Sequence, residues 1–231
     1  MGQNKKLWGL LQRRECTIPT WKGWLVLVLA FLVLGTAGMY ESYSFLAVSK
    51  PVTGGLLVVE GWAADLGMKA VIEEFRRNTY EKVYVTGGPL LWGGPLSEYK
   101  TYAEGGAASL VKLGLDVAQV QAVPSKWVMQ DRTYASAVSL RNWLQQHGVK
   151  ATRIHLMSEG PHARRSRLLF QKAFGNEVEV GVTALPPADY DERHWWRYSA
   201  GIRLFLDEGI AYIYARFFFH PGKGTANGKS S

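Results

Sequence analysis

The sequence predicts a Rossmann-like, three-layer α/β/α fold, with a mainly parallel sheet of about five strands and one transmembrane helix before it. Two observations carry this prediction. Short apolar runs alternate five times with segments whose apolar residues recur at helical spacing, and such alternation produces right-handed crossovers between parallel strands. Near the N-terminus, residues 24–40 are uncharged and almost entirely apolar, which is typical of a membrane span.

The expected elements follow one another without an internal repeat. Runs typical of buried strands cover residues 55–60, 82–86, 118–123, 153–157 and 177–182. Helical patterns cover residues 64–78, 97–113, 131–147, 161–174 and 195–218. Ser97 and Glu98 are expected to open the second of these helices, and Asp131 to cap the third. Gly148 and Gly175 are expected to end the third and fourth.

Residues 24–40 are expected to cross the membrane once. Aromatic residues of the kind found at membrane interfaces bracket the run: Trp21, Trp24, Tyr40 and Tyr43. The segment before the run is basic, with Lys5, Lys6, Arg13, Arg14 and Lys22 against Glu15. Because a basic flank stays in the cytoplasm, we expect a single-pass protein of the bacterial inner membrane with a cytoplasmic N-terminus and a periplasmic main domain. A cleaved signal peptide is the alternative, since Gly35 and Ala37 are small residues at a cleavage-like spacing.

The chain therefore divides into a basic cytoplasmic segment (1–23), the anchor (24–43), an extracytoplasmic α/β domain (50–219) and a disordered tail (220–231). The net charge is +8, but part of it precedes the anchor, so the outer domain is only mildly basic. Such a charge suits an anionic ligand or the membrane surface. The single cysteine, Cys16, precedes the anchor, which excludes a disulfide or a thiol nucleophile from the outer domain. Nucleic acid is not expected as a partner, because no motif that recognises it is present.

The last helical pattern has an apolar stripe that is expected to pack on the sheet. Ile202, Phe205, Leu206 and Ile213 recur at helical spacing, with Ile210 at the edge of the stripe. Arg203, Asp207 and Glu208 fall largely outside it. A second membrane span is the alternative, but these three charges interrupt it.

Glycine and polar residues follow the expected strands at their carboxyl ends, where ligands of parallel sheets bind. Gly87 and Gly88 allow backbone N–H groups to approach a ligand closely. His162 and Arg165 lie three residues apart at the start of a helix, so they share one face, and arginine binds phosphate or carboxylate through two hydrogen bonds. A carboxylate such as Glu98 can serve as acid, base or metal ligand.

This pattern predicts an anion-binding pocket. The expected catalytic residues are His162 and Glu98, and the expected ligand-binding residues are Glu60, Gly87, Gly88, Arg132, Thr133 and Arg165. Each also has a structural interpretation: a tight turn for the glycines, and helix starts for Glu98 and Thr133. The sequence has no GxSxG, Walker, HExxH or GxGxxG motif after the first strand. It assigns no cofactor and no metal.

The ordered set of these motifs resembles the ElyC/SanA/YdcF family of bacterial envelope proteins, from about Gly55 to Phe219. The features that carry the resemblance are Thr86-Gly87-Gly88 after a strand, Ser97-Glu98, Arg132-Thr133 and the pair His162 and Arg165. The chain departs from the family pattern at Ala135 and Ser136, where Glu and Asn are usual, and at Glu60-Gly61-Trp62, where Leu-Gly-Gly is usual. The resemblance implies a membrane-anchored protein connected with the envelope barrier and peptidoglycan-precursor metabolism.

Two functions are compatible with these residues. In the first, the domain binds a phosphorylated or lipid-linked glycan precursor and hydrolyses or transfers a phosphoryl or glycosyl-phosphate group, with His162 as general acid or base and Glu98 orienting it. In the second, the same pocket only recognises such a ligand, or a protein partner that the sequence does not identify, in envelope or exopolysaccharide assembly. Metal-stimulated turnover of phosphate esters would favour the first.

The topology can be tested with a reporter fused after Ser231. Because positive charge precedes the apolar run, we expect alkaline phosphatase, which is active only outside the cytoplasm, to be active in this fusion. A fluorescent protein that matures only in the cytoplasm is the control and should stay dark at the same position. Fluorescence with no phosphatase activity would contradict the predicted orientation.

Overall fold

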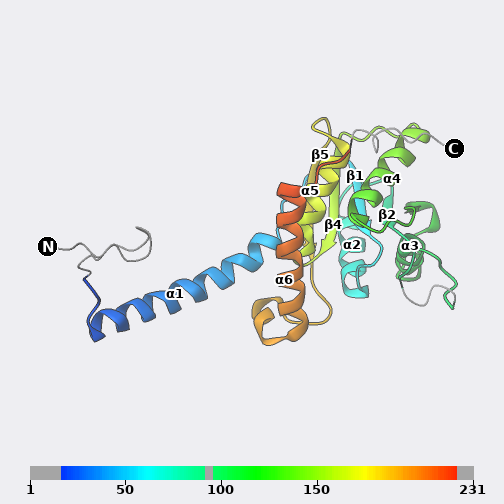
Figure 1. The fold of residues 1–231 in the computed structure, drawn as a ribbon. Helices are drawn as coiled ribbons and strands as arrows, with labels where there is room; N and C mark the ends of the chain where they lie inside the picture. The colour runs from blue at the N-terminus through cyan, green and yellow to red at the C-terminus, as the bar shows by residue number, and fades with distance from the viewer. Residues whose placement is uncertain (1–16, 92–95, 223–231) are drawn as a thin grey trace. The chain divides into compact units, whose positions relative to one another are not determined.

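The computed structural model describes residues 17–91 and 96–222. The chain divides into two compact units, and the boundary along the sequence falls between Glu41 and Ser42. In the second unit, five parallel strands form one sheet in the order β3-β2-β1-β4-β5 (Figure 1). The strands are β1 (Leu56–Glu60), β2 (Val83–Gly87), β3 (Val120–Pro124), β4 (Arg153–Glu159) and β5 (Glu179–Leu185). The predicted fold class is therefore confirmed.

The first unit contains most of α1 (Trp21–Leu46), which has only exposed and partly exposed side chains from Trp21 to Gly38. Among the described residues, α1 is the one helix long and apolar enough to cross a membrane. Its last residues, from Ser42, belong to the second unit, where Tyr43 and Leu46 are buried. The basic segment before residue 17, with Cys16, and the tail beyond residue 222 lie outside the described residues.

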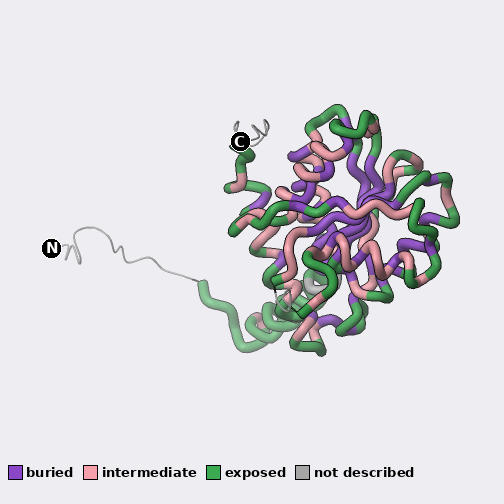
Figure 2. The backbone as a smooth tube through the Cα atoms, turned by 90° about the vertical axis from the view of Figure 1, so that its right-hand side faces the viewer, coloured by how far each residue is buried: buried purple, intermediate pink, exposed green. Residues whose placement is uncertain are grey.

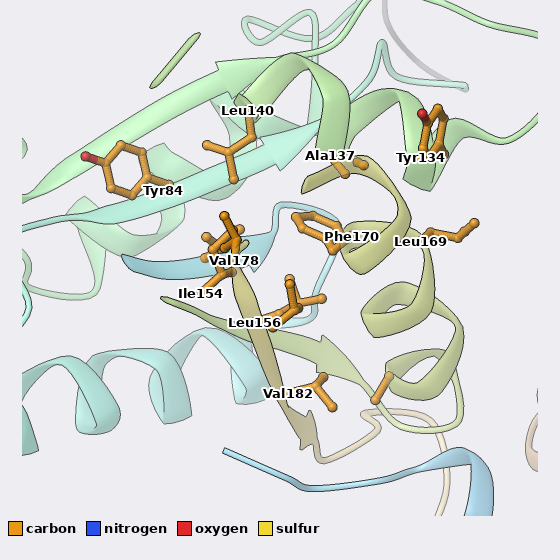
Figure 3. Close-up of a cluster of buried hydrophobic side chains, with 14 of the residues drawn as sticks. Tyr84, Tyr134, Ala137, Leu140, Ile154, Leu156, Leu169, Phe170, Val178 and Val182 are labelled. Carbon is orange, nitrogen blue, oxygen red and sulfur yellow. The ribbon is translucent and has the colours of Figure 1, made fainter. Parts of the chain in front are cut away.

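Helices cover both faces of the sheet, because β1, β2 and β4 bury side chains in both directions. On one face, Val58 belongs to a cluster with residues of α4 (Arg132–Gln146) and α5 (His162–Phe174). Figure 3 shows Leu140 of α4 and Phe170 of α5 in this cluster. On the other, Leu57 packs with α2 (Asp65–Arg77) and α3 (Tyr102–Lys112). Buried residues are accordingly concentrated at the centre of the unit, where the strands lie (Figure 2).

The second predicted helix begins five residues later than expected. Ser97 and Glu98 do not start α3, which is capped by Thr101. The Thr101 side chain accepts a hydrogen bond from the backbone of Glu104, and the Glu104 carboxylate accepts one from the backbone of Thr101, which is a capping box. Just before the helix, Lys100 and Thr101 pair with residues 89–90, so the helix begins only after them.

The prediction that the last helix packs through its apolar stripe is wrong. The helix α6 (Ser199–Ile213) follows a 3₁₀ segment, η2 (Glu192–Arg197), and continues into a π-helical turn, η3 (Tyr214–Phe218). Its buried residues are Gly201 and Glu208, whereas Ile202, Leu206, Ile210 and Ile213 are exposed. Two contacts explain this rotation: the backbone of Trp195 lies directly against Gly201, and Glu208 forms buried ion pairs described below.

Two adjacent glycines in α3 provide a test of the close contact between this helix and the end of β1. A Cβ atom on Gly106 would lie 2.6 Å from the Cα of Gly61, whereas one on Gly105 would meet nothing within 4 Å. We expect Gly105→Ala to raise the free energy of unfolding by about 0.5–1 kcal/mol through helix propensity. Gly106→Ala should instead lower it by about 1–3 kcal/mol, because the backbone must move.

The measurement is urea denaturation of the full chain in detergent, followed by circular dichroism. The two variants add the same methyl group to the same helix, so Gly105→Ala is the matched control. An equal gain of stability in both variants would show that α3 and β1 are not in close contact at this point.

Candidate functional site

A pocket of about 580 Å³ lies at the carboxyl edge of the sheet. It begins at the end of β1, one of the two neighbouring strands at which the strand order reverses, and extends toward β2 and β3; the carboxyl ends of the strands near such a reversal are the usual ligand site of these sheets. Its walls come from the ends of β1, β2 and β3, the starts of α4 and α5, and one side of α6. All of these elements belong to the second unit.

His162, the first residue of α5, lies at the base of this pocket with a fixed ring. Its Nδ1 atom is 2.8 Å from Oε1 of Glu208. Its Nε2 atom has only long contacts, 3.4 Å to Oε1 of Glu60 and 3.5 Å to Oγ1 of Thr133. The edge-to-face contact with the Trp62 ring, at 4.9 Å between centroids, completes the support. Because a good N–H···O bond is about 2.9 Å long, Nε2 is a donor that the protein itself uses poorly.

Arg165 is bound to Glu208 through two hydrogen bonds. Its Nε atom donates to Oε2 at 2.8 Å and its Nη2 atom to Oε1 at 3.0 Å. The same Nη2 atom lies 2.9 Å from Nδ1 of His162. In the protonated imidazole, Nδ1 donates its hydrogen to Glu208 and has no lone pair with which to accept one from Arg165. The contact between Nη2 and Nδ1 is therefore a close approach and not a hydrogen bond.

Glu60 ends β1 and is almost completely buried. The hydroxyl of Ser158 donates to its Oε2 atom, and the hydroxyl of Ser166 lies 3.0 and 3.1 Å from its two oxygens. Nε2 of His162 adds the longer contact with Oε1, at 3.4 Å. The buried cluster of Glu60, His162, Arg165 and Glu208 thus has two negative and two positive charges when His162 is protonated.

The protonation states follow from this balance. Burial by itself lowers the pKa of His162, but the carboxylates of Glu60 and Glu208 outweigh it and raise the pKa to about 9. Burial raises the pKa of Glu208, but His162 and Arg165 outweigh it and lower the pKa to about 2. The pKa of Glu60 is likewise lowered by His162, Ser158 and Ser166 against the effect of burial. Near neutral pH, His162 is therefore a cation between two carboxylates.

Seven of the eight residues predicted for the site line this one pocket. They are Glu60, Gly87, Gly88, Arg132, Thr133, His162 and Arg165. Glu98 is the exception: its side chain is exposed and does not belong to the lining. The expectation that Glu98 orients His162 is wrong, because Glu98 lies before α3 and outside the pocket lining, and Glu208 makes the contact with His162 instead.

Two further findings change the roles expected from the sequence. The guanidinium of Arg165 is already engaged with Glu208, so it is not a free bidentate group for a ligand. Gly87 is needed for packing, because a Cβ atom there would lie 2.7 Å from the Cβ of Tyr102. Gly88, by contrast, would meet only the Ser125 hydroxyl, at 3.3 Å.

The roles of Glu208, Trp62 and the two serines that bind Glu60 were not predicted from the sequence. Glu208 is one of three charges in an apolar helical segment, and nothing in that pattern shows which of the three faces inward. It also gave no role to Lys126, which lines the pocket with Arg132 and Asp131. The side chains of Lys126 and Arg132 are exposed, and neither forms an ion pair within residues 17–91 and 96–222.

Within the described part of the chain, no group of three His, Cys, Asp or Glu side chains has the arrangement of a metal site. The comparisons with known proteins add no assignment. No protein-family model matches the chain, and no curated protein or solved structure is detectably similar to it. The resemblance to the ElyC/SanA/YdcF family therefore stays a prediction from the sequence motifs, and the chemistry of the site must be inferred from its geometry.

The pKa of His162 makes stability depend on pH. Because the pKa is about 9 in the folded protein and 6.5 for an ordinary histidine, the stabilisation is complete below pH 6.5 and disappears as pH rises through 9. We expect the free energy of unfolding to fall by about 3 kcal/mol across this interval. Glu208→Gln keeps the shape but removes one carboxylate, so it should lower the pKa of His162 and flatten this dependence.

The measurement combines urea denaturation of the full chain in detergent at several pH values with NMR titration of the histidine rings. Asp207→Asn is the matched control, since Asp207 is the exposed neighbour of Glu208 on the same helix. If Glu208→Gln and Asp207→Asn leave the same pH dependence, Glu208 does not hold the charge of His162.

Proposed function

We propose that the α/β unit binds a phosphorylated or lipid-linked glycan precursor in this pocket, as part of a membrane-anchored protein of the bacterial envelope. The observation that carries the proposal is the Nε2 atom of His162. It belongs to a cationic ring at the base of the pocket, and its contacts with the protein are all longer than 3.3 Å. A phosphate oxygen placed there would receive a charge-assisted hydrogen bond.

The remaining lining suits the same class of ligand. Lys126 and Arg132 add two exposed cations at the rim, and Trp127 is an exposed aromatic ring beside them. Phosphate is attracted to such cations, and sugar rings stack on aromatic faces. The membrane location is supported by α1, the single candidate span among the described residues; the inner membrane and the periplasmic orientation rest on the charge pattern before it.

A catalytic version assigns three proton transfers. Water would attack phosphorus while the bond to the leaving oxygen breaks. His162 would give its Nε2 proton to that oxygen, and Glu60 would take a proton from the water and return it to His162. The high pKa of His162 supports the first transfer, because the ring is protonated when the ligand arrives.

A non-catalytic binding module is the second candidate, and one observation favours it. Both buried carboxylates are stabilised in the ionised form, so the cluster contains no base with a pKa near neutrality. In this version the cluster only holds His162 as a fixed cation. The protein would then recognise the ligand for a partner in envelope or exopolysaccharide assembly.

Ligand binding can be tested with inorganic pyrophosphate, titrated calorimetrically into the full chain in nanodiscs. Removing a cation from the rim, in Lys126→Gln or Arg132→Gln, should weaken binding about tenfold, the value of one charge-assisted hydrogen bond. Lys150→Gln removes the same charge from an exposed position that is not part of the pocket lining, and should leave binding unchanged. Equal effects of all three substitutions would indicate non-specific attraction and contradict a ligand site here.

Catalysis is tested separately with p-nitrophenyl phosphate and its diester, with magnesium or with a chelator. If the protein is an enzyme, His162→Gln should abolish turnover, whereas pyrophosphate should still bind but about tenfold more weakly, because Lys126 and Arg132 remain and one charge-assisted hydrogen bond is lost. Binding without turnover in the unsubstituted protein would favour the recognition module.

A further inference from the structure

The helix α6 has two faces with different surroundings. Leu204, Glu208 and Ala211 line the pocket. On the opposite side, the outer face of α6 consists of four apolar side chains that are 39%, 53%, 69% and 53% exposed: Ile202, Leu206, Ile210 and Ile213. At 3.6 residues per turn, these four lie within an arc of roughly 80°. A continuous apolar stripe of this kind on a surface helix indicates an interaction site.

The composition around the stripe is that of a helix lying on a lipid surface. The turn after α6 continues the apolar surface with Phe217 and Phe218, which are 65% and 70% exposed. Exposed Arg203 and Arg216 flank it, and Asp207 lies farther round the helix, roughly 100° from the centre of the stripe. Interfacial helices combine an apolar face, aromatic residues and flanking basic side chains in this way.

The first residues of the second unit pack against α6. Within the second unit, the ring centroids of Phe45 and Tyr212 are 5.7 Å apart, edge to face, and the side chain of Leu46 lies next to Gly209 of α6. The apolar run ends at Tyr40, five residues before Phe45, and five residues of chain reach at most about 18 Å. If residues 24–40 cross the membrane, α6 therefore lies close to its surface.

We infer that the outer face of α6 inserts into the interfacial layer of the same lipid bilayer that holds α1. This inference rests on the membrane anchorage in the proposed function. It gives the pocket a location, because the opposite face of the same helix lines it. The pocket then lies about one helix diameter, roughly 10–12 Å, from the lipid headgroups, where the headgroup of a lipid-linked ligand can enter without leaving the membrane.

The test measures the depth of single positions of the full chain in vesicles of phosphatidylethanolamine and phosphatidylglycerol. In a Cys16→Ser background, an environment-sensitive fluorophore is attached at Ile210→Cys and, separately, at Leu206→Cys. Doxyl-labelled lipids should quench both and their emission should shift to the blue. Leu29→Cys, in the middle of the apolar run, should be quenched as well, and Val117→Cys, which is 70% exposed in the turn before β3, should not.

The outcomes separate this inference from the anchor on which it rests. Quenching at position 29 but not at 206 and 210 overturns the role of α6 and leaves the anchor intact. Absence of quenching at all positions overturns both. A blue shift at 210 without quenching by lipid, together with chemical cross-linking into dimers, shows that a second copy covers the stripe and also overturns the inference.

Discussion

A buried cluster of two carboxylates and two cations holds α6 against the rest of the α/β unit. Isolated charges are expensive to bury, and a buried ion pair is stable only when every member has partners. Here Glu208 accepts hydrogen bonds from His162 and from Nε and Nη2 of Arg165. Glu60 accepts hydrogen bonds from the hydroxyls of Ser158 and Ser166. Removing one member of such a cluster typically costs 3–5 kcal/mol, because the remaining charge is left without compensation. The cluster therefore determines the rotation of α6, even though this leaves an apolar stripe exposed.

The position of the cluster follows from the strand order. Glu60 is the last residue of β1 and Ser158 lies near the end of β4, and these are the neighbouring strands between which the order reverses. Beside β2, the end of β1 lies directly against α3 and leaves no room for side chains. A Cβ atom on Gly61 or Gly87 would collide with Tyr102 of α3, and one on Gly106, within α3, would collide with Gly61. Space for a ligand therefore remains between the cluster and the loops that follow β2 and β3, where the rim carries Lys126 and Arg132.

The two faces of α6 connect the pocket with the surroundings of the protein. A purely structural helix would bury its apolar stripe, and this one buries a glutamate instead. Burying four large apolar side chains normally stabilises a protein by several kcal/mol. Leaving them exposed is consistent with a helix whose outer face has a partner of its own.

Sequence pattern alone predicted the order of the strands and helices, the apolar span and most of the pocket, because periodicity and chain direction are local properties and parallel strands deliver their carboxyl ends to one edge. Thus Glu60, His162 and Arg165 were correctly expected to lie together. The orientation of α6 and the start of α3 were not predictable in this way. Glu208 faces inward because His162 and Arg165, more than forty residues earlier in the chain, supply the compensating charge. Glu98 stays outside because Lys100 and Thr101 pair with residues 89–90 and α3 begins only after them. Both outcomes depend on contacts between residues that are separated in the sequence. The free energy of these contacts outweighs local helix propensity and the hydrophobic pattern, and the contacts form only once the fold has brought the residues together.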